Sequence, residues 1–161
     1  MRIKSRHFLK NSDIKKITDE LQVIFGAEIE ELFRGNLEIA ETDERYNLIL
    51  QNGEPVMFFV DGRPFPTVRG ALKLRTKKRS VIIDGGAVKF IAKGADVMCP
   101  GIINADQEIQ RGDLVIVMDE VHGKALAIGK ALLSGEEMTG EKGRAVKSLH
   151  YVGDRIWSVK V

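Results

Sequence analysis

The segment IIDGGAVKFIAKGADVMCPGI, residues 82–102, carries the pattern that decides the fold of the C-terminal half of the chain. An apolar run at Val81–Ile83 predicts a strand, and the residues after it predict a short helix over Ala87–Lys93. Asp84 stands where a side chain accepts hydrogen bonds from the first turn of a helix, and Gly94 stands where a helix ends. We therefore expect a strand, a short capped helix and a glycine-containing loop.

Further short apolar segments follow at close intervals, separated by Gly or Asp-Gly. They are rich in Val, Ile and Leu, which is typical of strands. We expect strands at Val97–Ile103, Leu114–Met118, Ala125–Leu133, Gly143–Leu149 and Arg155–Val159. This spacing predicts a small, closed or nearly closed β structure in which helix is the minor component.

The N-terminal half has a different pattern. From Asn11 or Ser12 to Gly26, apolar residues recur at helical spacing, which predicts an amphipathic helix. The short segments after it predict an antiparallel meander with strands at Ile29–Phe33, Asn36–Ala40, Tyr46–Gln51 and Pro55–Val60. Asp61–Pro64 interrupts that pattern, and Thr67 begins a short helix over 67–74. The prediction is an α+β protein with a mixed α/β domain over residues 1–75 and a β pseudo-barrel over 76–161.

Positive charge is concentrated in the middle of the chain. The formal net charge is +2, but Arg63–Lys93 contains nine Lys/Arg and one Asp/Glu, a net charge of +8. The flanking segments, residues 1–62 and 94–161, carry −4 and −2. Such a density is tolerated where solvent screens the charges or where a polyanion covers them. RNA is the polyanion that we expect.

The sequence has no recognisable pattern for catalysis or metal binding. Gly135–Gly140 has the glycine spacing of a phosphate-binding loop, but Glu141 replaces the lysine. Cys99 is the only cysteine and lies in an apolar run, where a buried, unreactive thiol is expected. The histidines are isolated from one another: His7, His122 and His150. We predict no catalytic residue, no metal site and no cofactor.

No apolar run approaches the roughly 20 residues of a membrane span. Residues 1–10 also lack the apolar core of a signal peptide. We therefore expect a cytoplasmic protein without a membrane partner.

The best candidate for contact with RNA is the helix and loop of residues 82–102. Lys89 and Lys93 lie one turn apart and can face phosphates from the same side. Glycines permit a close backbone approach, so the loop after the helix can read an unpaired base or a 3′ end. Phe90 and Trp157 are expected to pack inside the protein, which argues against base stacking. The predicted RNA-binding residues are Arg75, Lys77, Lys78, Arg79, Gly85, Gly86, Lys89, Lys93, Gly94, Ala95, Asp96, Val97 and Met98.

A structural interpretation of the same residues stays open. Gly94 then only ends the helix, and Val97 and Met98 only fill the core. The basic run Lys73–Arg79 is in this interpretation a solvated linker.

The motif Gly-Ala-x-x-Met-x-Pro-Gly at residues 94–101 resembles the opening signature of PUA domains. Arg111–Val117 resembles the Gly-Asp-x-Val segment of that family, and Ala127–Gly129 resembles the strand in which small residues pack on the barrel. The likeness covers nearly the whole chain. Runs similar to the malignant T-cell-amplified sequence family, in its archaeal form, are Gly53–Pro55, Pro66–Arg69, Met98–Gly101, Leu149–Tyr151 and Trp157.

Members of that family are translation-associated proteins with a small N-terminal domain and a C-terminal PUA domain. The resemblance implies binding of tRNA or of rRNA in the small ribosomal subunit, during initiation or recycling, with a second translation factor as a candidate partner of the N-terminal domain. One alternative is an RNA-docking accessory to a tRNA or rRNA modification enzyme. Another is a protein adaptor whose N-terminal domain presents Val56, Phe58, Phe59 and Phe65; exposure of these side chains favours it and burial counts against it.

Overall fold

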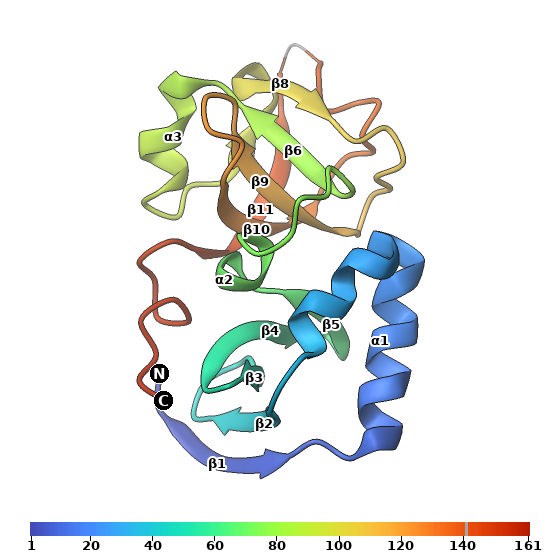
Figure 1. Cartoon of the computed structure of the whole chain (residues 1–161). Helices are drawn as coiled ribbons and strands as arrows, with labels where there is room; N and C mark the ends of the chain where they lie inside the picture. Colours follow the sequence, from blue (N-terminus) through green and yellow to red (C-terminus); the bar gives the residue numbers. More distant parts are fainter. Residues whose placement is uncertain (141) are drawn as a thin grey trace. The chain divides into compact units, whose positions relative to one another are not determined.

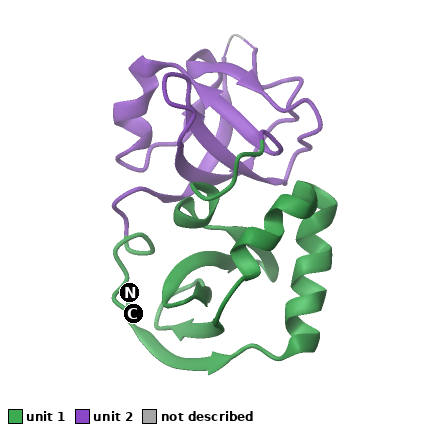
Figure 2. Cartoon of the chain, in the orientation of Figure 1, with its two compact units in different colours: residues 1–76, 155–161 green, residues 77–154 purple. Residues whose placement is uncertain are grey.

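The computed structural model of the chain describes residues 1–140 and 142–161 and divides into two compact units (Figure 2). Unit 1 comprises Met1–Thr76 together with Arg155–Val161, and unit 2 comprises Lys77–Asp154. The chain therefore passes between the units twice. In the described part of the chain, no helix has both the length and the apolar character needed to cross a bilayer.

Unit 1 contains a five-stranded antiparallel sheet in the order β1-β2-β3-β4-β5 (Figure 1). The strands are β1 (Ile3–Phe8), β2 (Leu37–Thr42), β3 (Leu48–Gln51), β4 (Glu54–Val60) and β5 (Arg63–Pro66). The predicted meander is confirmed for β2, β3 and β4. Both edge strands were missed, because β1 is largely exposed and charged, and β5 contains two prolines, which an edge strand tolerates.

The predicted N-terminal helix is confirmed as α1 (Asn11–Phe25). Its buried residues are Ile17, Leu21 and Phe25, which share one face at helical spacing. The Phe25 ring lies 5.5 Å from that of Phe65 on β5, centroid to centroid. Burial of this stripe is what attaches α1 to the sheet.

The strand predicted at Ile29–Phe33 is wrong, since this segment lies in the 3₁₀ helix η1 (Gly26–Phe33). Ile29 and Leu32 are both fully buried, and their spacing of three matches a 3₁₀ turn, not the alternation of a strand. Further along, α2 (Val68–Ala71) is capped as predicted by Thr67, whose hydroxyl accepts from the Gly70 N–H at 3.2 Å.

Unit 2 is a six-stranded sheet in the order β7-β11-β10-β9-β6-β8, which curls into a nearly closed barrel (Figure 1). The strands are β6 (Ser80–Ile83), β7 (Val97–Met98), β8 (Ile102–Ala105), β9 (Leu114–Asp119), β10 (Ala125–Ala131) and β11 (Arg144–Tyr151), with α3 (Gly85–Ile91) between β6 and β7. Neighbouring strands are antiparallel except β6 and β9, which are parallel. The predicted fold class is confirmed.

Two predicted strands of this half differ from the structure. The run Val97–Ile103 is divided by the 3₁₀ turn η2 (Cys99–Gly101), because Pro100 cannot donate a hydrogen bond to a continuous ladder. Arg155–Val159 forms no strand and belongs to unit 1.

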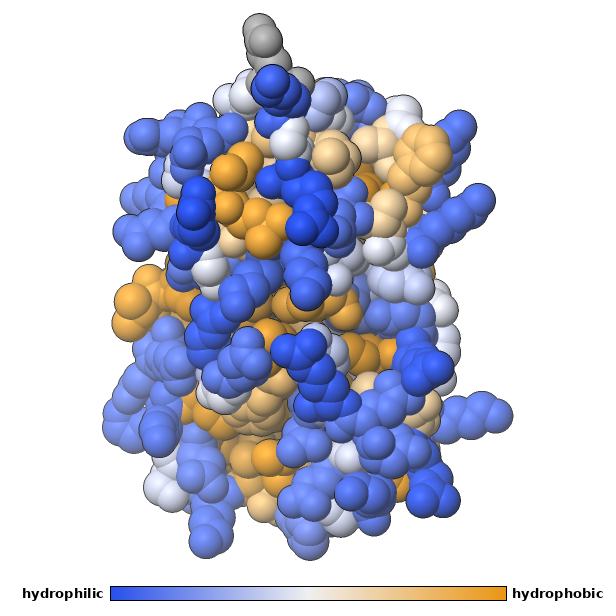
Figure 3. Space-filling model, turned by 180° about the vertical axis from the view of Figure 1, so that it is seen from behind, coloured by the Kyte–Doolittle hydropathy of each residue, from blue (hydrophilic) through white to orange (hydrophobic). Residues whose placement is uncertain are grey.

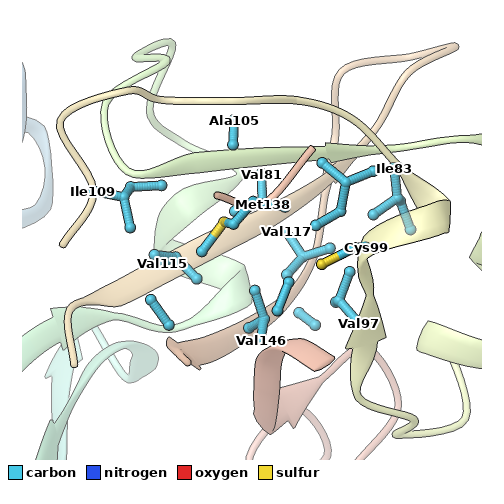
Figure 4. Close-up of a cluster of buried hydrophobic side chains, with 14 of the residues drawn as sticks. Val81, Ile83, Val97, Cys99, Ala105, Ile109, Val115, Val117, Met138 and Val146 are labelled. Carbon is cyan, nitrogen blue, oxygen red and sulfur yellow. The ribbon is translucent and has the colours of Figure 1, made fainter. Parts of the chain in front are cut away.

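Side chains from several strands and α3 meet in the interior of unit 2 (Figure 4). Val81, Val117 and Val146 from three different strands contribute to it, and Cys99 is 2% exposed, which confirms the expected buried thiol. Gly129 on β10 confirms the expectation that small residues pack on the barrel, since a Cβ there would lie 2.3 Å from Val146 Cγ1.

Candidate nucleic-acid interface

Helix α3 packs one face against the core of unit 2. Asp84 caps the helix as predicted, with Oδ1 accepting from the Ala87 N–H at 3.0 Å. The helix begins at Gly85 and ends at Ile91, in each case two residues before the predicted position, so Lys93 lies outside it. Ile91 is buried, and Ala87 and Val88 pack against the same core. These contacts fix which side of α3 faces solvent.

The solvent face of α3 carries two lysines and an aromatic ring. Gly86, Lys89 and Phe90 are exposed, and Lys93 follows in the turn that ends the helix, with its N–H donating to the Phe90 carbonyl. Spacings of three and four residues place these positions on one side. Because Lys93 lies beyond the last helical residue, Ile91, the alignment of its side chain with that of Lys89 stays a prediction.

Phe90 does not lie in the core, contrary to the prediction. Its side chain is 57% exposed, and the Lys89 ammonium nitrogen lies 5.2 Å from its ring centroid. The reason is the helical phase, since Val88 and Ile91 already occupy the core-facing positions on either side of Phe90. Trp157, by contrast, packs against another side chain, as predicted. It is half-buried, and Arg69 Cζ lies 3.8 Å from the centroid of its ring.

The loop after α3 is held in one conformation by backbone and side-chain contacts. Gly94 has φ +95°, a left-handed conformation that glycine adopts without steric cost, and a Cβ there would lie 2.7 Å from the Tyr151 ring. Asp96 accepts from the Ser148 N–H and from Arg144, each at 2.9 Å. Asp96 therefore ties the loop to β11.

The remaining predicted loop residues divide between the core and the surface. Val97 is buried, as the structural interpretation holds, whereas Ala95 is exposed and Met98 is 47% exposed. Met98 thus does not only fill the core. Ala95 and the Met98 thioether are therefore the parts of this loop that are exposed to solvent.

The N-terminal end of α3 is acidic. The Glu120 carboxylate accepts from the Gly85 N–H at 3.2 Å, and the Glu120 N–H donates to the Ile83 carbonyl at 3.1 Å. The Asp84 carboxylate occupies the same end of the helix. Two carboxylates repel phosphate here, so Gly85 and Gly86 are placed less favourably for an anion than Lys89 at the opposite end. Sequence reasoning missed Glu120, which is 35 residues away from its partner.

The basic run before β6 is partly committed to structure. Arg79 has φ +60°, its guanidinium donates to the Leu114 carbonyl at 3.1 Å and its Nε lies 3.8 Å from Asp113. Lys78 forms an ion pair of 3.3 Å with Glu108, while Lys77 is exposed. Arg75 is exposed in unit 1, where its N–H donates to Glu28. Arg79 and Lys78 are therefore engaged by other groups of unit 2, whereas Arg75 belongs to unit 1.

The four apolar side chains on which the adaptor hypothesis rests are mostly buried. Val56 and Phe58 are fully buried and Phe65 is 1% exposed, which counts against that hypothesis. Phe59 is half-buried and lines a hollow of about 250 Å³ between α1 and the sheet. Figure 3 shows one face of the protein, where hydrophobic residues appear in separate patches among hydrophilic ones.

Comparison with known domains defines the class of the protein. A PUA domain matches residues 79–152, and a domain of unknown function, DUF1947, matches residues 5–74. The solved structure of a conserved PUA domain protein from Thermoplasma acidophilum has a TM-score of 0.80 and 25% sequence identity, and the match covers 94% of this chain and 97% of that one. This chain is a PUA-domain protein.

Three relatives define the family more closely. An uncharacterized protein of Methanocaldococcus jannaschii is 46% identical over 99% of both chains. Malignant T-cell-amplified sequence 1 of Rattus norvegicus is 30% identical over 94% of this chain and 89% of its own length. Translation machinery-associated protein 20 of Schizosaccharomyces pombe is 34% identical over 71% of this chain and 67% of its own. The chain belongs to the family of malignant T-cell-amplified sequence 1 and Translation machinery-associated protein 20, which confirms the resemblance.

Proposed function

We propose that this protein binds tRNA, the small ribosomal subunit or both during translation initiation or recycling, through the solvent face of α3 and the loop after it. The PUA domain and the translation-associated relatives support an RNA-binding role in translation. The proposed role is binding without catalysis, in the cytoplasm, and without a metal or cofactor. We also propose that the boundary between the N-terminal domain and the PUA domain lies between residues 75 and 76.

The observation that carries the proposal is the position of Lys89 and Lys93. Both are exposed: Lys89 lies on the solvent face of α3, whose opposite face is fixed in the core, and Lys93 lies in the turn that follows the helix. The carboxylates of Asp84 and Glu120 are engaged at the opposite end of the helix. An RNA backbone therefore meets positive charge at one end of α3 and negative charge at the other, which orients it along the helix.

The test is the salt dependence of tRNA binding by the double variant Lys89→Ala/Lys93→Ala. Each phosphate contact releases counterions, so loss of both lysines should weaken binding and flatten the plot of log affinity against log salt by about 0.7 per contact. Fluorescence anisotropy with labelled tRNA at several salt concentrations measures both quantities.

The control is Lys10→Ala/Lys15→Ala, which removes the same charge from exposed positions in unit 1. It should leave the slope unchanged. Wild-type affinity and slope in the Lys89/Lys93 variant would remove this face of α3 as the RNA site.

The alternative roles are an RNA-docking accessory to a modification enzyme and a protein adaptor, and a second translation factor is the candidate partner of the N-terminal domain. The hollow beside Phe59 favours a protein partner on unit 1, but three of the four apolar side chains named for that role are buried. RNA is the partner favoured by the charge on α3.

A further inference from the structure

Phe90 is an aromatic ring that the fold leaves in solvent on the proposed RNA-binding face. Its side chain is 57% exposed although the next residue, Ile91, is 3% exposed. Because Ala87, Val88 and Ile91 supply the contacts between α3 and the core, the Phe90 ring is not needed to attach the helix. Its free face has the size and polarity to receive another flat ring.

Positive charge accompanies this ring. The Lys89 ammonium lies 5.2 Å from the ring centroid, and the exposed Lys93 follows in the turn after the helix. Proteins that hold single-stranded nucleic acid combine aromatic faces, on which bases stack, with cations that track the backbone. A nucleotide whose base lies on Phe90 would have its adjacent phosphates within the reach of long lysine side chains.

We infer that Phe90 stacks on an unpaired base of the bound RNA, with Lys89 and Lys93 holding the neighbouring phosphates. The inference rests on the proposed function and deepens it, since it specifies unpaired RNA as the ligand of this face. A base inside a duplex has no free π-face, so paired RNA is excluded from the stacking contact.

The test compares Phe90→Ala, Phe90→Leu and Phe90→Trp in the full chain. The probes are a labelled single-stranded RNA of about 12 nucleotides, within the site sizes known for such proteins, and its fully paired duplex. Phe90→Ala should weaken binding of the single strand by about tenfold, which corresponds to about 1.4 kcal/mol. Phe90→Leu should be similarly weak because it keeps apolar area but has no ring, while Phe90→Trp should retain affinity and show quenching of its added fluorescence when the single strand binds.

Phe8→Ala is the matched control, since Phe8 is 74% exposed on β1 of unit 1 and the substitution removes the same side chain. It should bind the single strand as the wild type does. The salt slope should stay unchanged in Phe90→Ala, because no charge is removed.

The outcomes separate this inference from the proposed function. Suppose that Phe90→Ala and Phe90→Leu bind the single strand with an affinity within about twofold of wild type, while the Lys89/Lys93 variant binds it more weakly. The stacking inference is then wrong, and the proposal that RNA binds this face of α3 is still supported. If the Lys89/Lys93 variant also binds normally, the RNA face itself is wrong. The stacking inference is also wrong if Phe90→Leu binds the single strand as tightly as the wild type does, or if the wild type binds the duplex and the single strand with equal affinity.

Discussion

At the scale of single residues, Gly94 links the fold of unit 2 to its proposed RNA site. Its φ of +95° disfavours any residue with a Cβ, and a Cβ there would meet the Tyr151 ring. Gly112 has a similar φ of +91°, but a Cβ added to it would have no neighbour within 4 Å. The pair therefore separates the cost of the backbone conformation from the cost of displacing Tyr151.

We expect Gly112→Ala to lower the free energy of unfolding by about 1–2 kcal/mol, the cost of a left-handed conformation. Gly94→Ala should lower the free energy of unfolding by more than Gly112→Ala does, because Tyr151 must also move. Of the two variants, only Gly94→Ala should weaken tRNA binding. Urea denaturation and anisotropy titrations measure the two effects. Equal stability losses in both variants would show that the Tyr151 contact contributes nothing.

Asp119 gives a second prediction at this scale. Burial raises the pKa of its carboxyl, but hydrogen bonds from the backbone N–H groups of His122 and Lys124 outweigh this, so the pKa lies below its ordinary value. The folded state is therefore stabilised by ionised Asp119 above the unfolded pKa of about 3.9, and this contribution is lost as the pH falls through the lower folded pKa.

Asp119→Asn should consequently lower the Tm of the full chain at pH 7, by about 2–4 °C for each kcal/mol lost. The difference from wild type should shrink below about pH 4 and vanish at lower pH, because the wild-type carboxyl is then also neutral. Thermal scans of both proteins over this range test it, and a difference independent of pH would mean that the charge of Asp119 is not responsible.

At the scale of elements, periodicity predicted what depends on local sequence. α1 was predicted correctly because its buried residues recur at helical spacing, and the existence of α3 because Asp84 caps its start, although the predicted bounds lay two residues too far along the chain. The edge strand β1 was missed because an exposed strand has little apolar alternation, and η1 was mistaken for a strand because a short apolar run fits either structure.

The candidate site shows the same division between local and distant information. The spacing of Lys89 and Lys93 was readable from the sequence, since the two residues lie close together along the chain, in α3 and in the turn after it. The contact of Glu120 with Gly85 and that of Asp96 with Arg144 join segments that are 35 and 48 residues apart, so no local pattern contained them. Phe90 was misplaced because one residue of helical phase decides between core and solvent.

At the scale of the whole molecule, the last residues of the chain return to unit 1 after the barrel of unit 2 is complete. Arg69 donates two hydrogen bonds to the Trp157 carbonyl, at 2.9 and 3.2 Å, and its guanidinium lies over the Trp157 ring. Arg155 pairs with Glu44 at 2.8 Å. The tail 155–161 is therefore held by residues of unit 1, and a fragment that starts at residue 76 lacks its partners.

We expect residues 77–154 to fold alone, since the core of unit 2 is built from its own residues. Extending this fragment to residue 161 should leave its stability unchanged, because Arg69 and Glu44 are absent from it.

In the full chain, Trp157→Ala should instead lower the stability of unit 1 by about 1–2 kcal/mol, through loss of the ring beneath the Arg69 guanidinium and of its packing. Amide hydrogen exchange, analysed separately for each unit, measures the stability of unit 1. Arg69→Lys is the companion variant, because it keeps the positive charge but loses the planar guanidinium. Protection should fall in unit 1 and persist in β6, β9 and β10. An unfolded amide spectrum for residues 77–154, or a loss of protection shared equally by both units, would show that the two units fold as one.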